Sequence, residues 1–183
     1  NNLLHFVRDY MLIGGMPAVL KAFFETSDYY LCKKIQSDII QSFNDDFVKY
    51  AKESDTPHLH KVFSAIPTQI GQKFMYSKID KQTRSVKFAK ALDLLETAGI
   101  VYKIYHTKAD GIPLQARIDY SRFKVILFDV GLLQNLVNVN MELWINKPEI
   151  TMINQGGITE QFVGQELAAL LKTGKFSNLT YWH

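Results

Sequence analysis

Apolar residues recur at helical spacing over the first third of the chain. Leu3 to Leu12 forms one such stretch, and Gly14-Gly15 followed by Pro17 indicates that this helix ends there and a second one begins. A longer amphipathic pattern runs from Asp28 to Ala51, with Ser27 or Asp28 as its predicted N-cap. Its apolar positions lie three or four residues apart and share one helical stripe: Ile35, Ile39, Phe43, Phe47 and Tyr50. The pattern predicts a helical N-terminal segment, in which Asn44-Asp45-Asp46 interrupts or restarts the long helix.

The middle of the chain combines helical patterns with strand-like runs. The predicted elements are a helix from about Leu59, a short helix opened by Pro67 and continuing through Ile70 and Phe74, a helix over Thr83–Ala98, and strands over Ile100–Tyr105 and Ile112–Ile118. Gly99 suits a left-handed C-cap, and Asp110-Gly111 is a turn signal between the strands. Three helices followed by a hairpin is the order of a winged helix-turn-helix, whose third helix commonly reads nucleic acid.

The last third predicts the beginning of an α/β unit. Its expected elements are a strand over Phe123–Phe128, a short helix after Asp129 as N-cap, an amphipathic helix from Gly156-Gly157 to about Leu171, and a strand starting at Leu179–Trp182. The sequence does not show which strand pairs with the last one. We therefore expect an α+β fold in three parts: a helical segment over residues 1–56, a winged helix-turn-helix over 57–128, and an incomplete, nuclease-like α/β domain over 129–183.

The composition is that of a globular protein. Apolar residues make up 47% of the chain and charged residues 21%, which argues against a disordered or fibrous protein. No apolar run approaches the roughly 20 residues needed to cross a bilayer. The one cysteine, Cys32, excludes an internal disulfide framework and suits a reducing compartment. We therefore expect a cytoplasmic location without membrane contact.

Positive charge is concentrated in the middle of the chain. Residues 51–130 hold thirteen basic and eight acidic side chains, whereas residues 1–50 hold five and six. An excess that coincides with a predicted winged helix is typical of a surface that contacts phosphates. The candidate nucleic-acid contacts are Lys73, Lys78, Lys81, Arg84, Lys87, Lys90, Lys103 and Lys108. A solvated lysine-rich face, or a winged helix that docks a protein, would show the same pattern.

The sequence predicts no catalytic or metal site. His58 and His60 have no third histidine or cysteine nearby, whereas a zinc ion needs about four convergent ligands. Glu160 and Glu166 lie six positions apart on a predicted helix, too far round it to work as an acid/base pair. We therefore expect a chain that is not an enzyme and holds no cofactor or metal.

Six short motifs follow one another over nearly the whole chain. They are Gly14-Gly15-Met16-Pro17; Asp46-Phe47-Val48-Lys49-Tyr50; Ile66-Pro67 with Lys73-Phe74-Met75-Tyr76-Ser77; Phe128-Asp129-Val130-Gly131-Leu132-Leu133; Gly157 to Val163 with Gln165-Glu166-Leu167; and Leu179-Thr180-Tyr181-Trp182. With these motifs the chain resembles the C-terminal part of prokaryotic predicted AAA-type ATPases, in which a domain of unknown function follows the ATPase core. The resemblance implies that ATP and Mg²⁺ bind an upstream domain, since this chain has no Gly-x-x-x-x-Gly-Lys-[Ser/Thr] loop.

The resemblance also implies a relation to the PD-(D/E)xK nuclease fold at the C-terminal end. There Glu160 matches the acid on the helix, and the other metal-binding positions would follow His183. Our leading hypothesis is a non-catalytic accessory region of an AAA-type ATPase that binds nucleic acid, with DNA as one ligand, or a protein partner such as its own ATPase domain. The alternatives are a shortened metal-dependent nuclease domain and a structural module that holds the ATPase in an oligomer.

Overall fold

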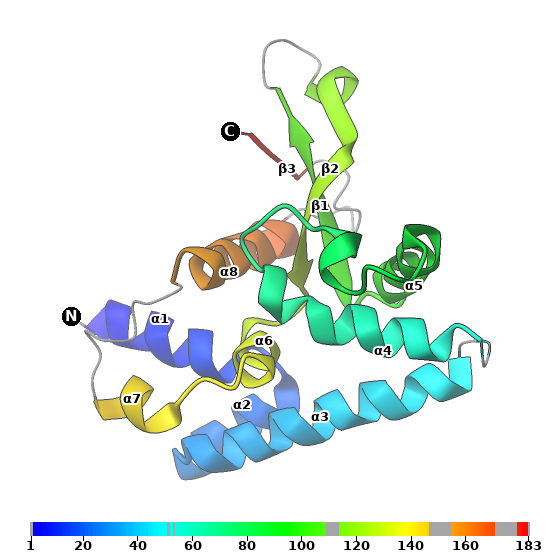
Figure 1. Ribbon diagram of the computed structural model, residues 1–183. Helices are drawn as coiled ribbons and strands as arrows, with labels where there is room; N and C mark the ends of the chain where they lie inside the picture. Colours follow the sequence, from blue (N-terminus) through cyan, green and yellow to red (C-terminus); the bar gives the residue numbers. More distant parts are fainter. Residues whose placement is uncertain are drawn as a thin grey trace.

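The structure is a computed structural model that describes residues 2–50, 52, 54–108, 114–146, 155–170 and 179–182 (Figure 1). Its helices are α1 (Asn2–Ile13), α2 (Pro17–Thr26), α3 (Tyr29–Tyr50), α4 (Thr56–Ala65), α5 (Ser85–Thr97), α6 (Val130–Leu136), α7 (Met141–Asn146) and α8 (Gln155–Leu170). Its strands are β1 (Val101–Thr107), β2 (Ile118–Leu127) and β3 (Thr180–Tyr181). Short 3-10 turns are η1 (Pro67–Gln69), η2 (Tyr76–Lys78) and η3 (Leu114–Arg117). The fold is α+β, as predicted, and no helix in the described ranges is long and apolar enough to span a membrane.

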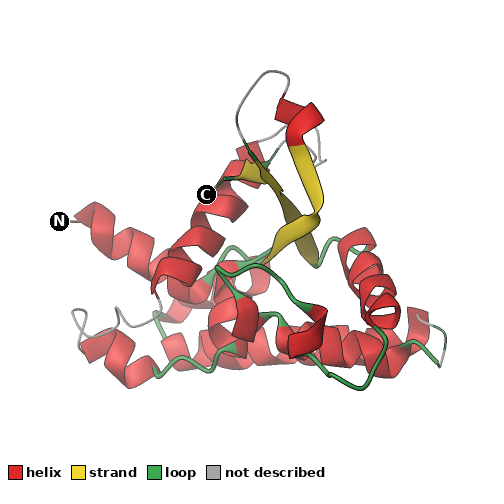
Figure 2. Cartoon of the chain, turned by 45° about the horizontal axis from the view of Figure 1, so that its top comes forward, coloured by secondary structure: helices red, strands yellow, loops and turns green. Residues whose placement is uncertain are grey.

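A small mixed sheet stands between two groups of helices. The strand order is β2-β1-β3, with β1 antiparallel to β2 and parallel to β3. Because side chains alternate along a strand, Phe123 and Val125 face the core that includes α4 and α5, while Lys124 and Ile126 face α8. The hairpin of β1 and β2 projects beyond the layer of helices (Figures 1 and 2). The partner of the last strand, which the sequence left open, is β1.

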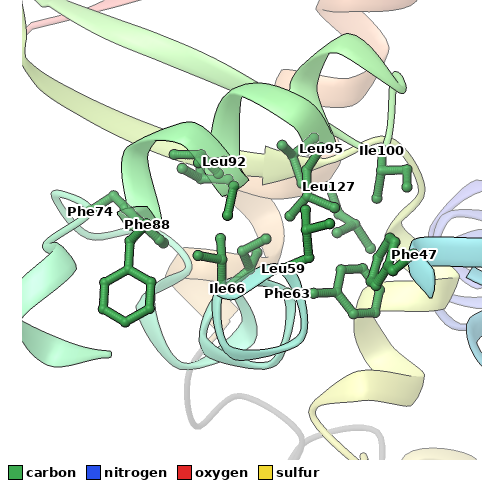
Figure 3. Close-up of a cluster of buried hydrophobic side chains, with 14 of the residues drawn as sticks. Phe47, Leu59, Phe63, Ile66, Phe74, Phe88, Leu92, Leu95, Ile100 and Leu127 are labelled. Carbon is green, nitrogen blue, oxygen red and sulfur yellow. The ribbon is translucent and has the colours of Figure 1, made fainter. Parts of the chain in front are cut away.

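The largest core lies between α3, α4, α5, α6 and one face of the sheet. Figure 3 shows ten of its side chains labelled: Phe47, Leu59, Phe63, Ile66, Phe74, Phe88, Leu92, Leu95, Ile100 and Leu127. Residues from before position 57 and after position 128, Phe47 and Leu132 among them, pack in the same cluster as the predicted winged helix. The core therefore extends across both predicted domain boundaries, which remain predictions.

The long helix α3 continues to Tyr50 without the predicted interruption. Its polar residues find partners along the helix, since Asn44 donates to the carbonyl of Ile40 at 3.0 Å and Asp46 pairs with Lys49 at 2.9 Å. At the other end, Asp28 accepts hydrogen bonds from the backbone N–H groups of Tyr30 and Leu31 at 2.8 and 3.1 Å, and so caps the helix as predicted.

The segment after Pro67 does not form the predicted second helix. It forms the turns η1 and η2. The backbone between these turns is hydrogen-bonded to β2, because the N–H of Phe74 donates to the carbonyl of Phe123 at 2.9 Å. The buried Gln69 accepts a further hydrogen bond from the N–H of Met75 at 2.8 Å. Because these two backbone N–H groups bond to partners outside a helix, the backbone between η1 and η2 is extended and not helical.

The prediction of a strand over Ile112–Ile118 is also wrong for the residues of this range that the structure describes before Ile118. Leu114–Arg117 is the 3-10 turn η3, and β2 begins at Ile118 and continues to Leu127, which joins it to the strand predicted over Phe123–Phe128. The turn signal Asp110-Gly111 lies outside the described residues. The antiparallel hairpin itself is present, with β1 as one arm and the longer β2 as the other.

Asp129 joins the start of α6 to the turn between α1 and α2. Its Oδ1 accepts from the N–H of Leu132 at 2.8 Å, which confirms the predicted N-cap, and its Oδ2 accepts from the N–H of Gly15 at 2.7 Å. Burial raises the pKa of Asp129, and the N–H hydrogen bonds oppose that rise. Gly14 has φ +72°, and a Cβ there would collide with the Asp129 carboxylate, while a Cβ at Gly131 would collide with the backbone of Ile13 and Gly14.

Hydrogen bonds of the Gln161 side chain connect α8 to the free edge of β2. Its amide oxygen accepts from the N–H of Leu127 at 2.8 Å, and its Nε2 donates to the carbonyl of Leu127 at 2.6 Å. The side chain is fully buried and satisfies two backbone groups as a neighbouring strand would. This pair of bonds fixes the position of α8 on the sheet.

We expect the variant Gln161→Met to lower the free energy of unfolding by about 2–3 kcal/mol, because two buried backbone groups of Leu127 lose their partners while the volume is kept. Urea denaturation measures the change. The exposed variant Gln82→Met serves as control and should shift stability by less than about 0.5 kcal/mol. Equal small effects in both variants would contradict a role of Gln161 in holding α8.

Candidate nucleic-acid interface

The structure exposes seven of the eight predicted basic residues and buries the eighth. Those at the surface are Lys73, Lys78, Lys81, Arg84, Lys87, Lys90 and Lys108. The buried one is Lys103, which is 9% exposed. The predicted set therefore divides into residues that a ligand can reach and one that it cannot.

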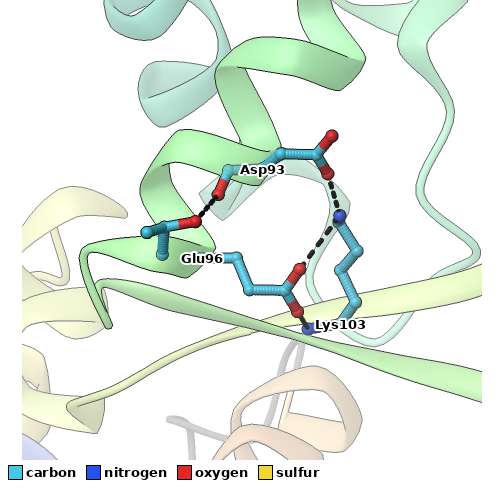
Figure 4. A network of polar contacts seen from close by, with 4 residues as sticks. Asp93, Glu96 and Lys103 are labelled. Atoms are coloured by element: carbon cyan, nitrogen blue, oxygen red, sulfur yellow. Dashed lines mark hydrogen bonds and ion pairs between the residues drawn. The ribbon is translucent and has the colours of Figure 1, made fainter.

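Lys103 belongs to an ion-pair network within the chain (Figure 4). Its ammonium group pairs with Asp93 and, at 3.0 Å, with Glu96, while its backbone N–H donates to Glu96 at 3.0 Å. Burial by itself lowers the pKa of Lys103, but the hydrogen bonds and charges of the two acids raise it above its ordinary value. The lysine thus stays charged and holds β1 against α5, so its prediction as a nucleic-acid contact is corrected to a structural role.

The side chains of two exposed lysines interact with neighbouring residues. Lys90 pairs with Asp55 at 2.7 Å, and Lys78 donates to the side-chain oxygen of Gln72 at 2.9 Å. The first interaction neutralises a charge, whereas the second leaves the charge of Lys78 uncompensated. Lys90 is therefore the weaker candidate for binding a phosphate.

The side chains of three cations that are close in the sequence have no hydrogen bond or ion pair to any part of the chain that the structure describes. They are Lys81, Arg84 and Lys87, which we call the basic surface. Lys81 precedes α5, Arg84 is its N-cap residue and Lys87 lies in its first turn. Lys73 and Lys108 are likewise exposed and unpaired within the described ranges, the first in the loop before η2 and the second at the end of β1. The basic surface therefore carries three cations that no carboxylate of the described residues pairs with.

Asp80, the only acid in the sequence between Lys73 and Lys90, is engaged inside the turn that precedes α5. Its carboxylate accepts from the N–H of Gln82 at 2.8 Å and the hydroxyl of Thr83 at 2.9 Å, and pairs with Lys61 at 2.8 Å. Lys61 and these two donors hold the pKa of Asp80 below its usual range. The acid shapes the turn and is balanced by Lys61, so it does not cancel the basic surface.

Three of the other residues considered from the sequence have partners within the chain. Glu160 pairs with Lys124 at 2.8 Å, Glu166 accepts from the Tyr10 hydroxyl at 3.0 Å, and His60 bonds to Asn44 at 3.0 Å. Burial raises the pKa of the Cys32 thiol. Among the described residues, no three histidines, cysteines or acids come together as a metal site.

The sequence pattern missed two exposed residues of β2, Tyr120 and Arg122. They lie where β2 bulges away from β1, between the pairs Tyr105–Phe123 and His106–Asp119. Asp119 accepts from the N–H and the hydroxyl of Ser121 at 2.9 and 2.6 Å, an Asx turn inside a strand. The Asp-x-Ser spacing is the signal that could have indicated this irregularity.

The chain belongs to the family described as a domain of unknown function, DUF8612, which it matches over residues 4–143. The match covers the helices α3, α4 and α5, the hairpin and the basic surface. No curated protein and no solved structure matches the chain.

We expect Lys103→Met to lower the free energy of unfolding by about 1–2 kcal/mol, because Asp93 and Glu96 lose the cation between them and both carboxylates are partly exposed. Thermal or urea denaturation measures the loss. Lys21→Met is the matched control, since Lys21 makes an exposed pair with Glu25 at 4.0 Å, and it should cost less than about 0.5 kcal/mol. If Lys103→Met unfolded at the same denaturant concentration as the wild type, Lys103 would have no structural role.

Proposed function

We propose that this chain is a non-catalytic accessory region of an AAA-type ATPase that binds nucleic acid through the basic surface. The observation that carries the proposal is the group formed by Lys81, Arg84 and Lys87, three adjacent exposed cations without a carboxylate partner in the described part of the chain. They lie at the start of α5 and in the turn before it, and α5 precedes a β-hairpin, as the reading helix of a winged helix-turn-helix does. The second helix of that motif is replaced here by η1 and η2.

Phosphate binding accounts for the arrangement of these side chains. The N-terminus of α5 carries a partial positive charge from the aligned peptide dipoles, and the N-cap Arg84 places no side-chain oxygen over it. Cations grouped at such a position release condensed counterions when they bind a polyphosphate backbone. Exposed Val86 lies between Arg84 and Lys87 and supplies an apolar contact to the same ligand.

We expect the triple variant Lys81→Ala, Arg84→Ala, Lys87→Ala to bind a 20-base-pair DNA duplex at least about tenfold more weakly than the wild type at low salt. The reason is that three phosphate contacts are lost. Fluorescence anisotropy at two salt concentrations gives the affinities, and the dependence of affinity on salt should become shallower in the variant.

The control removes the same number of charges elsewhere, in Lys21→Ala, Lys34→Ala, Lys49→Ala. These exposed lysines lie on α2 and α3, away from the basic surface in the sequence and on other helices. Their removal should weaken binding by less than about threefold through the change in net charge. Absence of binding by the wild type at low salt, or equal losses in both triple variants, would contradict the proposal.

A second candidate function is self-association through α1. Leu3, Leu4 and Phe6 are exposed apolar side chains in the first two turns of this helix, and adjacent apolar exposure of this kind favours a protein contact. The proposal corresponds to a structural module that holds an ATPase in an oligomer.

If α1 mediates self-association, the variant Leu4→Ser, Phe6→Ser will remain monomeric at concentrations where the wild type associates, because two large apolar contacts are lost. Multi-angle light scattering over a concentration series measures the mass. Val48→Ser, which alters an exposed apolar residue of α3, should leave the association unchanged. A wild-type mass that stays monomeric throughout the series would contradict self-association.

A further inference from the structure

The hairpin presents one exposed aromatic ring beyond the helical layer. Tyr120 is 67% exposed, and it lies in the stretch of β2 where three residues, 120–122, have no paired residue on β1. The Asx turn made by Asp119 and Ser121 shapes this bulge. A bulge of this kind can re-aim a side chain, and here the tyrosine ring remains exposed.

A series of aromatic contacts connects this ring to the hydrophobic core. The ring centroid of Tyr120 lies 5.1 Å from that of Tyr105, which lies 5.9 Å from Phe123. Phe123 in turn stacks on the buried Phe74 at 5.9 Å and an interplanar angle of 25°. Tyr120 thus packs against Tyr105 with part of its ring and leaves most of the side chain open to a ligand.

Tyr120 lies on the same side of the sheet as the helix that carries the basic surface. Tyr105 and Lys103 alternate with the residues that face α8, and Lys103 reaches Asp93 and Glu96 of α5. Because Tyr120 packs on Tyr105, its ring lies on the side of the sheet that faces the last turns of α5.

The charge around the ring suits an anionic ligand. Arg122, two residues away, is exposed and pairs with Asp119 at 3.5 Å. Exposed Lys108 at the end of β1 adds a second cation to the hairpin. Aromatic rings flanked by cations are the combination on which single-stranded nucleic acids bind, with bases stacked on the ring and phosphates beside the cations.

We propose that Tyr120 stacks on an unpaired base, so that the preferred ligand is a DNA duplex with a single-stranded extension. The inference rests on the proposed function, because the basic surface would hold the duplex part. Bases inside a duplex are already stacked on their neighbours, so an exposed ring at the hairpin finds a free base face only where the strands separate. The basic surface and Tyr120 would then contact the paired and the unpaired part of one ligand.

The experiment compares a blunt 20-base-pair duplex with the same duplex carrying roughly five unpaired nucleotides, by fluorescence anisotropy. The variants are Tyr120→Ala, the conservative Tyr120→Phe, and the control Tyr30→Ala, which removes an exposed tyrosine from α3. We expect the wild type, Tyr120→Phe and Tyr30→Ala to prefer the extended duplex. Tyr120→Ala should lose about tenfold in affinity for the extended duplex and bind the blunt duplex unchanged.

A second readout reports stacking directly. 2-Aminopurine at the first unpaired position should lose fluorescence when the wild type or Tyr120→Phe binds at saturating concentration, and should keep it with Tyr120→Ala. Equal affinities of Tyr120→Ala and wild type for the extended duplex, or equal losses on both ligands, would overturn the inference while leaving binding by the basic surface intact. If the wild type bound neither ligand, the proposed function and this inference would both fail.

Discussion

The placement of the N-terminal helices depends on one buried carboxylate. Asp129 accepts hydrogen bonds from Leu132, in the first turn of α6, and from Gly15, in the turn between α1 and α2. Phe128, one residue earlier, donates its N–H to the carbonyl of Ile100, where β1 begins. The same short segment therefore connects the sheet, α6 and the α1–α2 turn. Glycine is required at positions 14 and 131 because a side chain there would collide with this junction.

Two buried glutamine side chains fix the positions of neighbouring helices in the same way. Gln36 of α3 donates to the carbonyls of Leu12 and Ile13, both at 3.0 Å, and so satisfies the last turn of α1. Gln161 does the same for both backbone groups of Leu127 at the free edge of β2. Because a buried amide is costly unless its hydrogen bonds are made, each glutamine fits only one relative placement of the two elements that it joins. The helices on either side of the sheet are therefore positioned by specific polar bonds as well as by apolar packing.

Local sequence patterns predicted most of the long helices. The predictions failed where the conformation depends on residues that are distant in the sequence. The stripe from Ile35 to Phe47 and the caps Asp28, Gly99 and Asp129 depend on neighbours within one or two turns, and all appear in the structure. The segment after Pro67 was misjudged because its backbone donors bond to Phe123 and Gln69, and the first of these partners is some fifty positions away. The parallel pairing of β3 with β1 likewise joins residues that no local signal connects.

The candidate site shows the same division between local and distant information. The sequence placed Lys81, Arg84 and Lys87 correctly at the surface, since a turn and the first turn of a helix expose charged side chains. It misjudged Lys103 because alternation in a strand does not tell which face meets α5. Lys103 pairs with Asp93 and Glu96, which lie on the later turns of α5, whereas the basic surface lies at the start of this helix. The single charge of Lys103 offsets one of the two negative charges that these acids place on α5. If the basic surface binds a phosphate backbone as proposed, this offset weakens the repulsion from the later turns of α5.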